Sequence, residues 1–360
     1  MKRLIQLLIG LACVVYANAQ QPDFTSSIPQ SERYVSEFMD AHQVPGMQIA
    51  VSHKNKLVWS DSFGYSNLEL EIPVTKPSKF RIASVSKPVT AVLTAYLCQI
   101  GILDIDASVN DYFRELSNGR WDFTVRQLMS HAAGVRHYRP SDVNQAKYHS
   151  SIADGFHIIV NDSLLYEPGS RFSYSSYGYN IIAGYIECVT AQPFGDLVMD
   201  SLFIPLQMVH SAIDHPYEII PNRTSGYQLS EEGEVINAAF FDNRYKIPAG
   251  GMLSTAEDLV LFGNALLYGD YLSTESKELL FTPFVYRDEK ESDTGFGWVT
   301  TVDEQGNKLY GHLGGITGGC AAIMIYPDKE LVIVWLGNLD ADWSDIPTKT
   351  VANYFLEAIK

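Results

Sequence analysis

The sequence predicts an α/β protein in which an antiparallel sheet is flanked by helices and carries an inserted, mostly helical lobe. A hairpin pattern lies near the start of the chain, at residues 47–63, and strand-like segments follow one another near its end, between residues 297 and 337. Such segments most economically form one sheet with helices on its faces. The stretch between them, up to about Pro283, shows helical patterns broken by Pro and Gly, and we expect it to form the inserted lobe.

Hydrophobic spacing predicts the first elements. We expect a helix that Ser31 caps and that ends near Pro45-Gly46. Its apolar face consists of residues at helical spacing, namely Tyr34, Val35, Phe38 and Met39. Residues 47–52 and 56–63 are apolar or alternating around a polar turn, which is typical of a β-hairpin.

The apolar spacing from about Ser84 to Gly101 is again helical. Toward the end of the chain, β-branched and aromatic residues are frequent. Four segments there are expected to be consecutive antiparallel strands: 297–302, 308–312, 320–326 and 331–337. An amphipathic helix is expected to follow them, with an apolar face made by Val351, Tyr354, Phe355 and Ile359.

The chain is long enough for two lobes. About 340 residues remain after residues 1–19, which exceeds the size at which a single core stops growing. We assign residues 20–100 and 290–360 to an α/β lobe and residues 101–289 to a helical lobe that carries active-site loops. A cleft between the lobes is the expected place for chemistry.

The N-terminus has the pattern of a secretory signal. Lys2-Arg3 precedes the apolar stretch Leu4 to Val15, and the small-residue pattern Ala17-Asn18-Ala19 follows. The stretch is shorter than the roughly 20 residues of a spanning helix, and no later segment is continuously apolar over that length. We therefore expect residues 1–19 to be a cleaved signal peptide, no transmembrane span after cleavage, and a periplasmic or secreted protein. A lipoprotein anchored at Cys13 is the alternative, which we disfavour because Cys13 lies inside the apolar stretch instead of at its end.

Composition argues against a polyanion as partner. The chain has 26 Lys and Arg against 42 Asp and Glu, a net charge of −16. Nucleic-acid binding requires clustered basic residues, so we expect a small-molecule or peptide substrate and no nucleic acid, and leave the oligomeric state open. Cys98, Cys188 and Cys320 sit among apolar neighbours, and we expect each to be a buried small hydrophobe without a disulfide or a metal.

The strongest chemical signal is the segment Ser84-Val85-Ser86-Lys87, with Pro88 directly after it. Proline is tolerated only near the first turn of a helix, so Ser84 should lie at a helix N-terminus, where free N–H groups and the helix dipole favour an anionic oxygen. Lys87 shares a helix face with Ser84 and can take the hydroxyl proton once burial lowers its pKa. Because Ser-x-x-Lys also arises by chance about once or twice in a chain of this length, the motif needs support.

Two further segments offer that support. Residues 172–179 place Tyr174 among other aromatic residues ahead of an apolar helix, although a packed aromatic loop is an alternative reading. Residues 310–315 end a predicted strand with His312 and a pair of glycines. The glycines let a substrate approach closely and expose the Gly315 N–H to an oxyanion. A plain strand end with a solvated histidine is the alternative there.

In this order and spacing, the three segments resemble the active-site motifs of the penicillin-recognising serine hydrolases, which include class C β-lactamases and D-alanyl-D-alanine carboxypeptidases. The resemblance extends over residues 44–337. Additional segments that carry it are 130–138, 167–172 and 249–255. Within this superfamily, the segments 81–87, 134–138 and 254–269 look most like the mitochondrial β-lactamase-like protein of animals, which is regarded as a protease-like serine hydrolase. The resemblance implies a fold of the β-lactamase/transpeptidase type.

The resemblance also implies residue roles. Ser84 looks like the acylated serine and Lys87 like its proton acceptor, while Tyr174 looks like the residue that relays protons to the leaving group and from the deacylating water. His312 stands at the place of the usual lysine, where it would orient Tyr174 and help bind a substrate carboxylate. The N–H groups of Ser84 and Gly315 look like the oxyanion hole. Substrate-binding positions are Ser176, Leu313 and Gly314, and structural positions are His131, Gly250 and Gly251.

Two departures from the family pattern bear on the substrate. Tyr174-Ser175-Ser176 stands where Tyr-x-Asn is usual, so that Ser176 replaces the Asn, and Leu313 stands where a hydroxyl residue is usual. Losing one such polar contact costs about 1–3 kcal/mol, or roughly ten- to a hundred-fold in rate. We therefore expect an exported serine hydrolase that cleaves a peptide, amide or ester bond through an acyl-enzyme on Ser84, without metal or organic cofactor. The alternatives are an esterase or weak β-lactamase, or a non-catalytic binding or filament-forming protein on the same scaffold.

We predict a mature N-terminus at or near Gln20, because the signal cleavage site follows small residues such as Ala19. N-terminal sequencing or intact-mass measurement of the exported protein checks this. A chain that retains Met1, or that carries a lipid on Cys13, would contradict the prediction.

Overall fold

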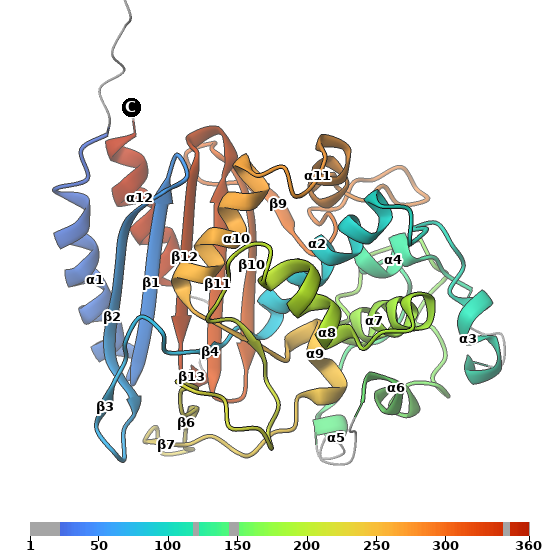
Figure 1. The fold of residues 1–360 in the computed structure, drawn as a ribbon, viewed down its shortest axis with the longest axis horizontal. Helices are drawn as coiled ribbons and strands as arrows, with labels where there is room; N and C mark the ends of the chain where they lie inside the picture. The colour runs from blue at the N-terminus through green and yellow to red at the C-terminus, as the bar shows by residue number, and fades with distance from the viewer. Residues whose placement is uncertain (1–21, 118–121, 144–150, 341–345, 360) are drawn as a thin grey trace, which may run out of the picture.

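The computed structural model describes residues 22–117, 122–143, 151–340 and 346–359. The predicted signal peptide, with Cys13 and Gln20, lies outside these residues. Within them the chain forms a seven-stranded antiparallel sheet in the order β3-β2-β1-β12-β11-β10-β9 (Figure 1). Its strands are β1 (Gly46–His53), β2 (Lys56–Asn67), β3 (Ile72–Pro73), β9 (Val299–Val302), β10 (Lys308–Ile316), β11 (Gly319–Tyr326) and β12 (Leu331–Gly337).

The central strands β1, β11 and β12 are buried along their whole length. Along β1, Met47, Ile49 and Val51 belong to one apolar core, whereas Ala50 belongs to the other. This alternation follows from the two-residue period of a strand. Because both faces of the sheet are covered, the central strands have nearly continuous apolar sequences.

Helices cover both faces of the sheet (Figure 1). On one face α1 (Ser27–His42) packs beside α12 (Pro347–Ala358), and on the other α10 (Ala256–Tyr268) packs against β1 and β12. The α10 contact is close at Gly263, where a Cβ would lie 2.6 Å from a methyl carbon of Val332. The core on the α10 side continues into α2 (Ser86–Gln99), so one hydrophobic core joins the sheet to the helix that follows Ser84.

Beyond α2 lies a region made mostly of short helices, with the longer α7 among them, at the right of Figure 1. They are α3 (Asn110–Ser117), α4 (Val125–Met129), α5 (Pro140–Val143), α6 (Ile152–Gly155), η3 (Phe156–Ile158), α7 (Ser176–Thr190), α8 (Phe194–Val198) and η4 (Met199–Phe203). The remaining helical segments are η1 (Ala83–Val85), η5 (Arg244–Lys246), α9 (Ile247–Gly250), α11 (Thr274–Phe281) and η6 (Pro327–Lys329).

Two small sheets complete the described fold. One has the order β4-β8-β5, formed by β4 (Phe80–Arg81), β8 (Met252–Ser254) and β5 (Ala212–Ile213). The other has the order β13-β6-β7, formed by β13 (Leu339–Asp340), β6 (Tyr227–Leu229) and β7 (Val235–Asn237). The pairing of β4 with β8 places the turn that follows β4 against α9, which follows η5 directly.

The predicted fold class, an antiparallel sheet flanked by helices with the hairpin and the C-terminal strands in one sheet, is confirmed. The predicted start of α1 is wrong: the helix begins at Ser27, and the Ser31 hydroxyl donates to the Ser27 carbonyl inside it. Pro29 lies in the first turn, where its missing N–H removes no helical hydrogen bond. The predicted end of the strand at His312 is also too early, since β10 continues to Ile316.

Other expectations are corrected or stay open. Cys188 is exposed near the end of α7, Cys98 is partly buried, and Cys320 is buried, so the expectation of burial holds fully for Cys320 alone. The division into lobes at residues 100 and 290 stays a prediction, and α10, from the middle of the chain, packs on the sheet. No helix among the described residues is long and apolar enough to cross a membrane.

Candidate active site

The turn that carries the candidate nucleophile joins a short strand to a helix. After β4, the 3₁₀ turn η1 presents Ser84 and leads directly into α2. Pro88 is the third residue of α2, so Ser84 lies at a helix N-terminus, as the sequence predicts. Ala83 has a φ of 48°, a left-handed conformation that costs about 1–2 kcal/mol for a residue with a Cβ. The surrounding contacts therefore hold the turn in a strained shape beside the nucleophile.

Lys87 is held next to the hydroxyl of Ser84. Its side chain is 0% exposed, its Nζ lies 3.1 Å from Ser84 Oγ, and it donates a hydrogen bond of 2.8 Å to the Ala249 carbonyl. Burial lowers the pKa of Lys87 well below its ordinary value, and the positive charge of Lys246 lowers it further. A neutral amine has a lone pair, so Lys87 is suited to accept the proton of the Ser84 hydroxyl.

Tyr174 stays protonated beside the same serine. Burial raises the pKa of Tyr174 to about 12, although interactions with the Ser84 and Ser176 hydroxyls favour the charged form. The Lys87 Nζ lies 4.8 Å from the centre of the Tyr174 ring. At neutral pH the phenol is therefore a proton donor, and the neutral amine of Lys87 is the better base.

Two histidines fix the loop that carries Tyr174. The backbone N–H of Ser175 donates to His131 Nδ1 at 3.0 Å, and that of Ser176 donates to His137 Nδ1 at 3.2 Å. Their ring centres lie 4.5 and 5.3 Å from that of Tyr174. Burial lowers the pKa of His131 well below its ordinary value and that of His137 to about 4. Both rings are thus neutral at physiological pH, which fits the structural role expected for His131.

His312 is a buried, neutral ring. Burial, followed by the charge of Lys87, lowers the pKa of His312 to about 3. Its Nδ1 lies 2.7 Å from the Leu313 carbonyl oxygen. Because a carbonyl can only accept, Nδ1 carries the proton and Nε2 is an acceptor. The implied help of His312 in carboxylate binding therefore lacks the positive charge it would need, whereas a role in orienting Tyr174, 6.3 Å away between ring centres, remains open to it.

The backbone N–H groups of Ser84 and Gly315 are the predicted oxyanion donors, and the structure places the two residues close together. The Ser84 N–H begins the helical region and makes no hydrogen bond within the described part of the chain. Gly315 is exposed on β10, next to the turn. Gly314 explains how the strand approaches so closely, because a Cβ there would lie 2.5 Å from the Ile82 oxygen and 3.0 Å from the Ser84 nitrogen. This arrangement fits an oxyanion hole formed by Ser84 and Gly315.

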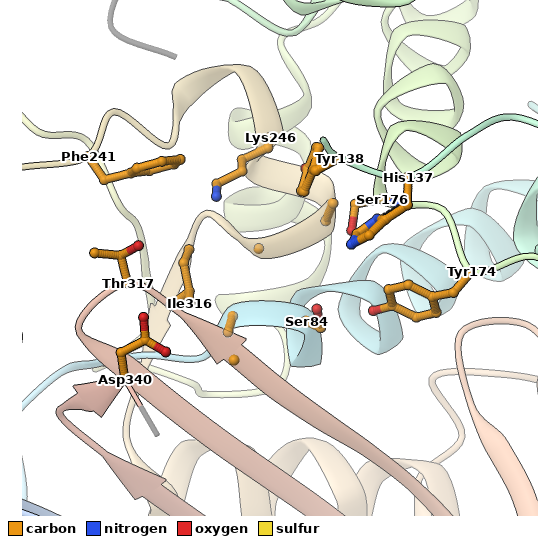
Figure 2. Close-up of a pocket in the computed structure, with 14 residues that line it drawn as sticks. Ser84, His137, Tyr138, Tyr174, Ser176, Phe241, Lys246, Ile316, Thr317 and Asp340 are labelled. Atoms are coloured by element: carbon orange, nitrogen blue, oxygen red, sulfur yellow. Dashed lines mark hydrogen bonds between the residues drawn. The ribbon is translucent and has the colours of Figure 1, made fainter. Parts of the chain in front are cut away.

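These groups meet at a cavity of about 570 Å³ (Figure 2). Predicted site residues that line it are Ser84, Tyr174, Ser176 and Gly315. Those that are buried and do not line it are Lys87, His312 and Gly314. Leu313 is 40% exposed and is not part of the lining. Tertiary structure therefore brings together the three segments that the sequence singled out. It leaves Leu313 exposed on β10, outside the cavity lining but two residues before Gly315, which lines the cavity.

The cavity also holds residues that sequence reasoning missed. They are His137, Tyr138, Phe241, Lys246, Thr317 and Asp340, among others. A signal for Lys246 was available, because it is the charged residue in the run 245–251 and lies three residues before the segment 249–255, which carries the family resemblance. Among the described residues, no group of three or more His, Cys, Asp and Glu side chains could hold a metal ion.

Residues 32–352 match the family model described as Beta-lactamase. The chain belongs to this family. A mouse protein, "Serine beta-lactamase-like protein LACTB, mitochondrial", is 26% identical over 85% of this chain and 74% of its own length. The octameric penicillin-binding protein homologue from Pyrococcus abyssi has a TM-score of 0.79 at 23% identity, covering 91% of this chain and 76% of that one. A class C β-lactamase has a TM-score of 0.76 at 20% identity, covering 95% and 98%. The resemblance and the β-lactamase-like fold that the sequence predicts are therefore confirmed.

We predict that Gly314→Ala slows acylation of Ser84 at least about ten-fold, because its Cβ must displace the nucleophile turn and misplacement by about 1 Å can cost a hundred-fold. The rate of covalent labelling by a fluorophosphonate measures this, with a thermal melt to show that the variant is folded. Gly195→Ala is the matched control, because its Cβ would meet only the side chain of Ile213. Wild-type labelling by a folded Gly314→Ala would contradict the prediction.

Proposed function

We propose that this protein is an exported serine hydrolase that cleaves a peptide, amide or ester bond through an acyl-enzyme on Ser84. Its membership of the β-lactamase family supports a serine hydrolase that forms an acyl-enzyme. One observation carries the specific proposal: the Nζ of a fully buried lysine, Lys87, lies 3.1 Å from Ser84 Oγ at the wall of a cavity. Placement in the periplasm or outside the cell rests on the N-terminal sequence pattern alone.

The proposed chemistry moves protons between three side chains. Lys87 takes the hydroxyl proton as Ser84 Oγ bonds to the substrate carbonyl carbon, and the negative oxygen is bound by the N–H groups of Ser84 and Gly315. Tyr174 then gives its proton to the leaving nitrogen or oxygen as the scissile bond breaks, and Lys87 returns a proton to Tyr174. In deacylation a water attacks the ester, its proton passes through Tyr174 and Lys87, and Ser84 regains its hydroxyl.

A non-catalytic binding or filament-forming protein is the competing class. Burying an amine such as Lys87 without a carboxylate is energetically unfavourable, and its acceptors here are a backbone carbonyl and the Ser84 hydroxyl. A scaffold with no chemistry has no evident use for that arrangement. Within the enzymes, an esterase or a weak β-lactamase is the alternative, since the same acyl-enzyme chemistry serves both.

We predict that a fluorophosphonate forms one adduct, on Ser84, as measured by intact-mass and peptide mass spectrometry. Ser84→Ala should remove the adduct. Ser86→Ala, a matched change two residues on at the first position of α2, should keep it. Lys87→Met and Tyr174→Phe should each lower turnover by orders of magnitude with the fold intact, because groups that act as one proton-transfer unit are not additive. An adduct on another residue, or equal labelling of Ser84→Ala, would refute the assignment.

The proposal for the substrate rests on the leaving-group side of the site. In a cephalosporin the carboxylate is attached to the ring that contains the leaving nitrogen. A carboxylate there would need a hydroxyl or a cation on the edge of β10, where this chain has Leu313 and the neutral His312. Leaving a charge without a partner is costly, and Ser176 also lacks the amide of the family pattern. We therefore propose a peptide, amide or ester without that carboxylate as the preferred substrate.

We predict that kcat/KM for a neutral p-nitrophenyl ester or peptide amide exceeds that for nitrocefin by at least about ten-fold, the scale of one lost hydrogen bond. Leu313→Thr should narrow the gap. Leu229→Thr, an exchange at another leucine that is 40% exposed, should leave the gap unchanged. Faster hydrolysis of nitrocefin than of the neutral substrates by the unmodified enzyme would make β-lactamase the leading function.

A further inference from the structure

Lys246 is a buried cation that opens onto the active-site cavity. Its side chain is 7% exposed and lines the same cavity as Ser84 and Gly315. Aromatic rings surround its ammonium group: the Nζ lies 3.8, 5.5 and 6.0 Å from the ring centres of Phe241, Tyr138 and Tyr245. These rings form a wall that holds the ammonium in place and favours its charge from one side.

Among the described residues, Lys246 differs from the other buried lysines because its Nζ has no hydrogen-bond acceptor. Lys79 donates to the Pro221 carbonyl at 3.1 Å, and Lys87 donates to the Ala249 carbonyl at 2.8 Å. Within the described part of the chain, no hydrogen bond or ion pair engages the Nζ of Lys246. A buried cation without an acceptor lowers stability, so its place beside a nucleophile suggests that a ligand completes its hydrogen bonds.

The position of Lys246 identifies the part of the substrate that it would meet. In Figure 2, Tyr174 and Lys246 lie on opposite sides of Ser84. Tyr174 gives its proton to the leaving group in the proposed chemistry, so the leaving group lies on the Tyr174 side. The acyl group, which stays bonded to Ser84, would then extend away from Tyr174, on the side of Lys246.

We propose that Lys246 binds a carboxylate at the distal end of the substrate's acyl group, and so makes the enzyme selective for anionic acyl chains. This inference rests on the proposed acyl-enzyme function of Ser84 and adds a substrate class to it. It does not conflict with poor use of cephalosporins, because their carboxylate lies on the leaving-group side. The enzyme would thus favour a negative charge on one side of the scissile bond and disfavour it on the other.

Electrostatics around Lys246 fits this role. Burial, and after it the charge of Arg81, lower the pKa of Lys246 to about 7, while the Asp214 carboxylate opposes both effects. A bound carboxylate would favour the protonated form and oppose the effect of burial. Asp340 is the acidic residue among those that line the cavity, and Figure 2 shows it beside Thr317, away from Lys246. The negative charge of Asp340 would repel an anionic acyl group, so Asp340 cannot supply the attraction that we assign to Lys246.

The test compares two esters that differ only in charge. They are mono-4-nitrophenyl glutarate, with a free distal carboxylate, and its methyl ester, in which that carboxylate is blocked. The measured quantity is the ratio of kcat/KM for the acid to kcat/KM for the methyl ester. We expect the unmodified enzyme to prefer the acid at least about ten-fold at pH 6, where Lys246 is mostly protonated.

Variants then assign the preference to one residue. Lys246→Met should bring the ratio to about one or below, because it slows the acid more than the methyl ester; any effect through the pKa of Lys87 acts on both esters and cancels in the ratio. Lys246→Arg should retain a preference. Lys79→Met, a matched change at a lysine that is 8% exposed and does not line the cavity, should leave the ratio unchanged. Asp340→Asn should keep or increase the ratio, because it removes a repulsive charge.

The outcomes separate the two proposals. If neither ester is hydrolysed and Ser84 is not acylated, the proposed function itself fails. If both esters are hydrolysed through Ser84 but the ratio is near one, or Lys246→Met leaves a high ratio unchanged, then Lys246 is not the anion-binding residue. Loss of the preference in Lys79→Met as well would show that any buried lysine affects the ratio indirectly, and would overturn the assignment.

Discussion

The site depends on excluding water from the amine of Lys87, which lies beside the hydroxyl of Ser84. Lys87 can act as a base only where water cannot stabilise its charge, and it must still have an acceptor to hold its direction. Both conditions are met because α9 places the Ala249 carbonyl 2.8 Å from Nζ while the cores around α2 exclude solvent. Thr90, one helical turn on, donates to the neighbouring Pro248 carbonyl at 2.7 Å, so α2 is fixed to the α9 segment at two points. The strained turn at Ala83 is tolerated because these contacts surround it.

Close backbone approach is the second constraint, and glycine satisfies it. β10 packs against the nucleophile turn, and Gly314 leaves space there for the Ile82 carbonyl. The proposed oxyanion hole of Ser84 and Gly315 depends on this close approach. Gly251 is similar, since a Cβ there would lie 2.8 Å from the Asn243 oxygen in the segment that carries Lys246. Gly314 and Gly251 are therefore explained by contacts between backbone segments, before any contact with substrate is considered.

Positive charge is distributed unequally on the two sides of Ser84. The histidines around Tyr174 are neutral, because burial and the nearby lysine lower their pKa values. Positive charge in the cavity is thus available on the Lys246 side of Ser84, while the Leu313 side of β10 offers none to a substrate anion. Lys246 also lowers the pKa of Lys87, so the same residue that faces the acyl group helps keep the proposed base neutral. Substrate recognition and base strength are electrostatically linked.

The sequence by itself determined the main sheet, the family, and the residues that we propose carry the chemistry. Alternating and continuous apolar runs fix strands through a local period, and Ser84, Lys87 and Pro88 define a helix start within five residues, so both could be read locally. The start of α1 at Ser27 and the continuation of β10 through Gly314 were missed, because neighbouring segments decide which of several allowed local conformations is adopted. Tertiary structure alone decided three features: Lys246 lines the cavity, His312 is neutral, and Leu313 lies outside the cavity lining. Burial and the distance between charges set a pKa and a direction of approach, and both depend on segments more than a hundred residues apart in the chain.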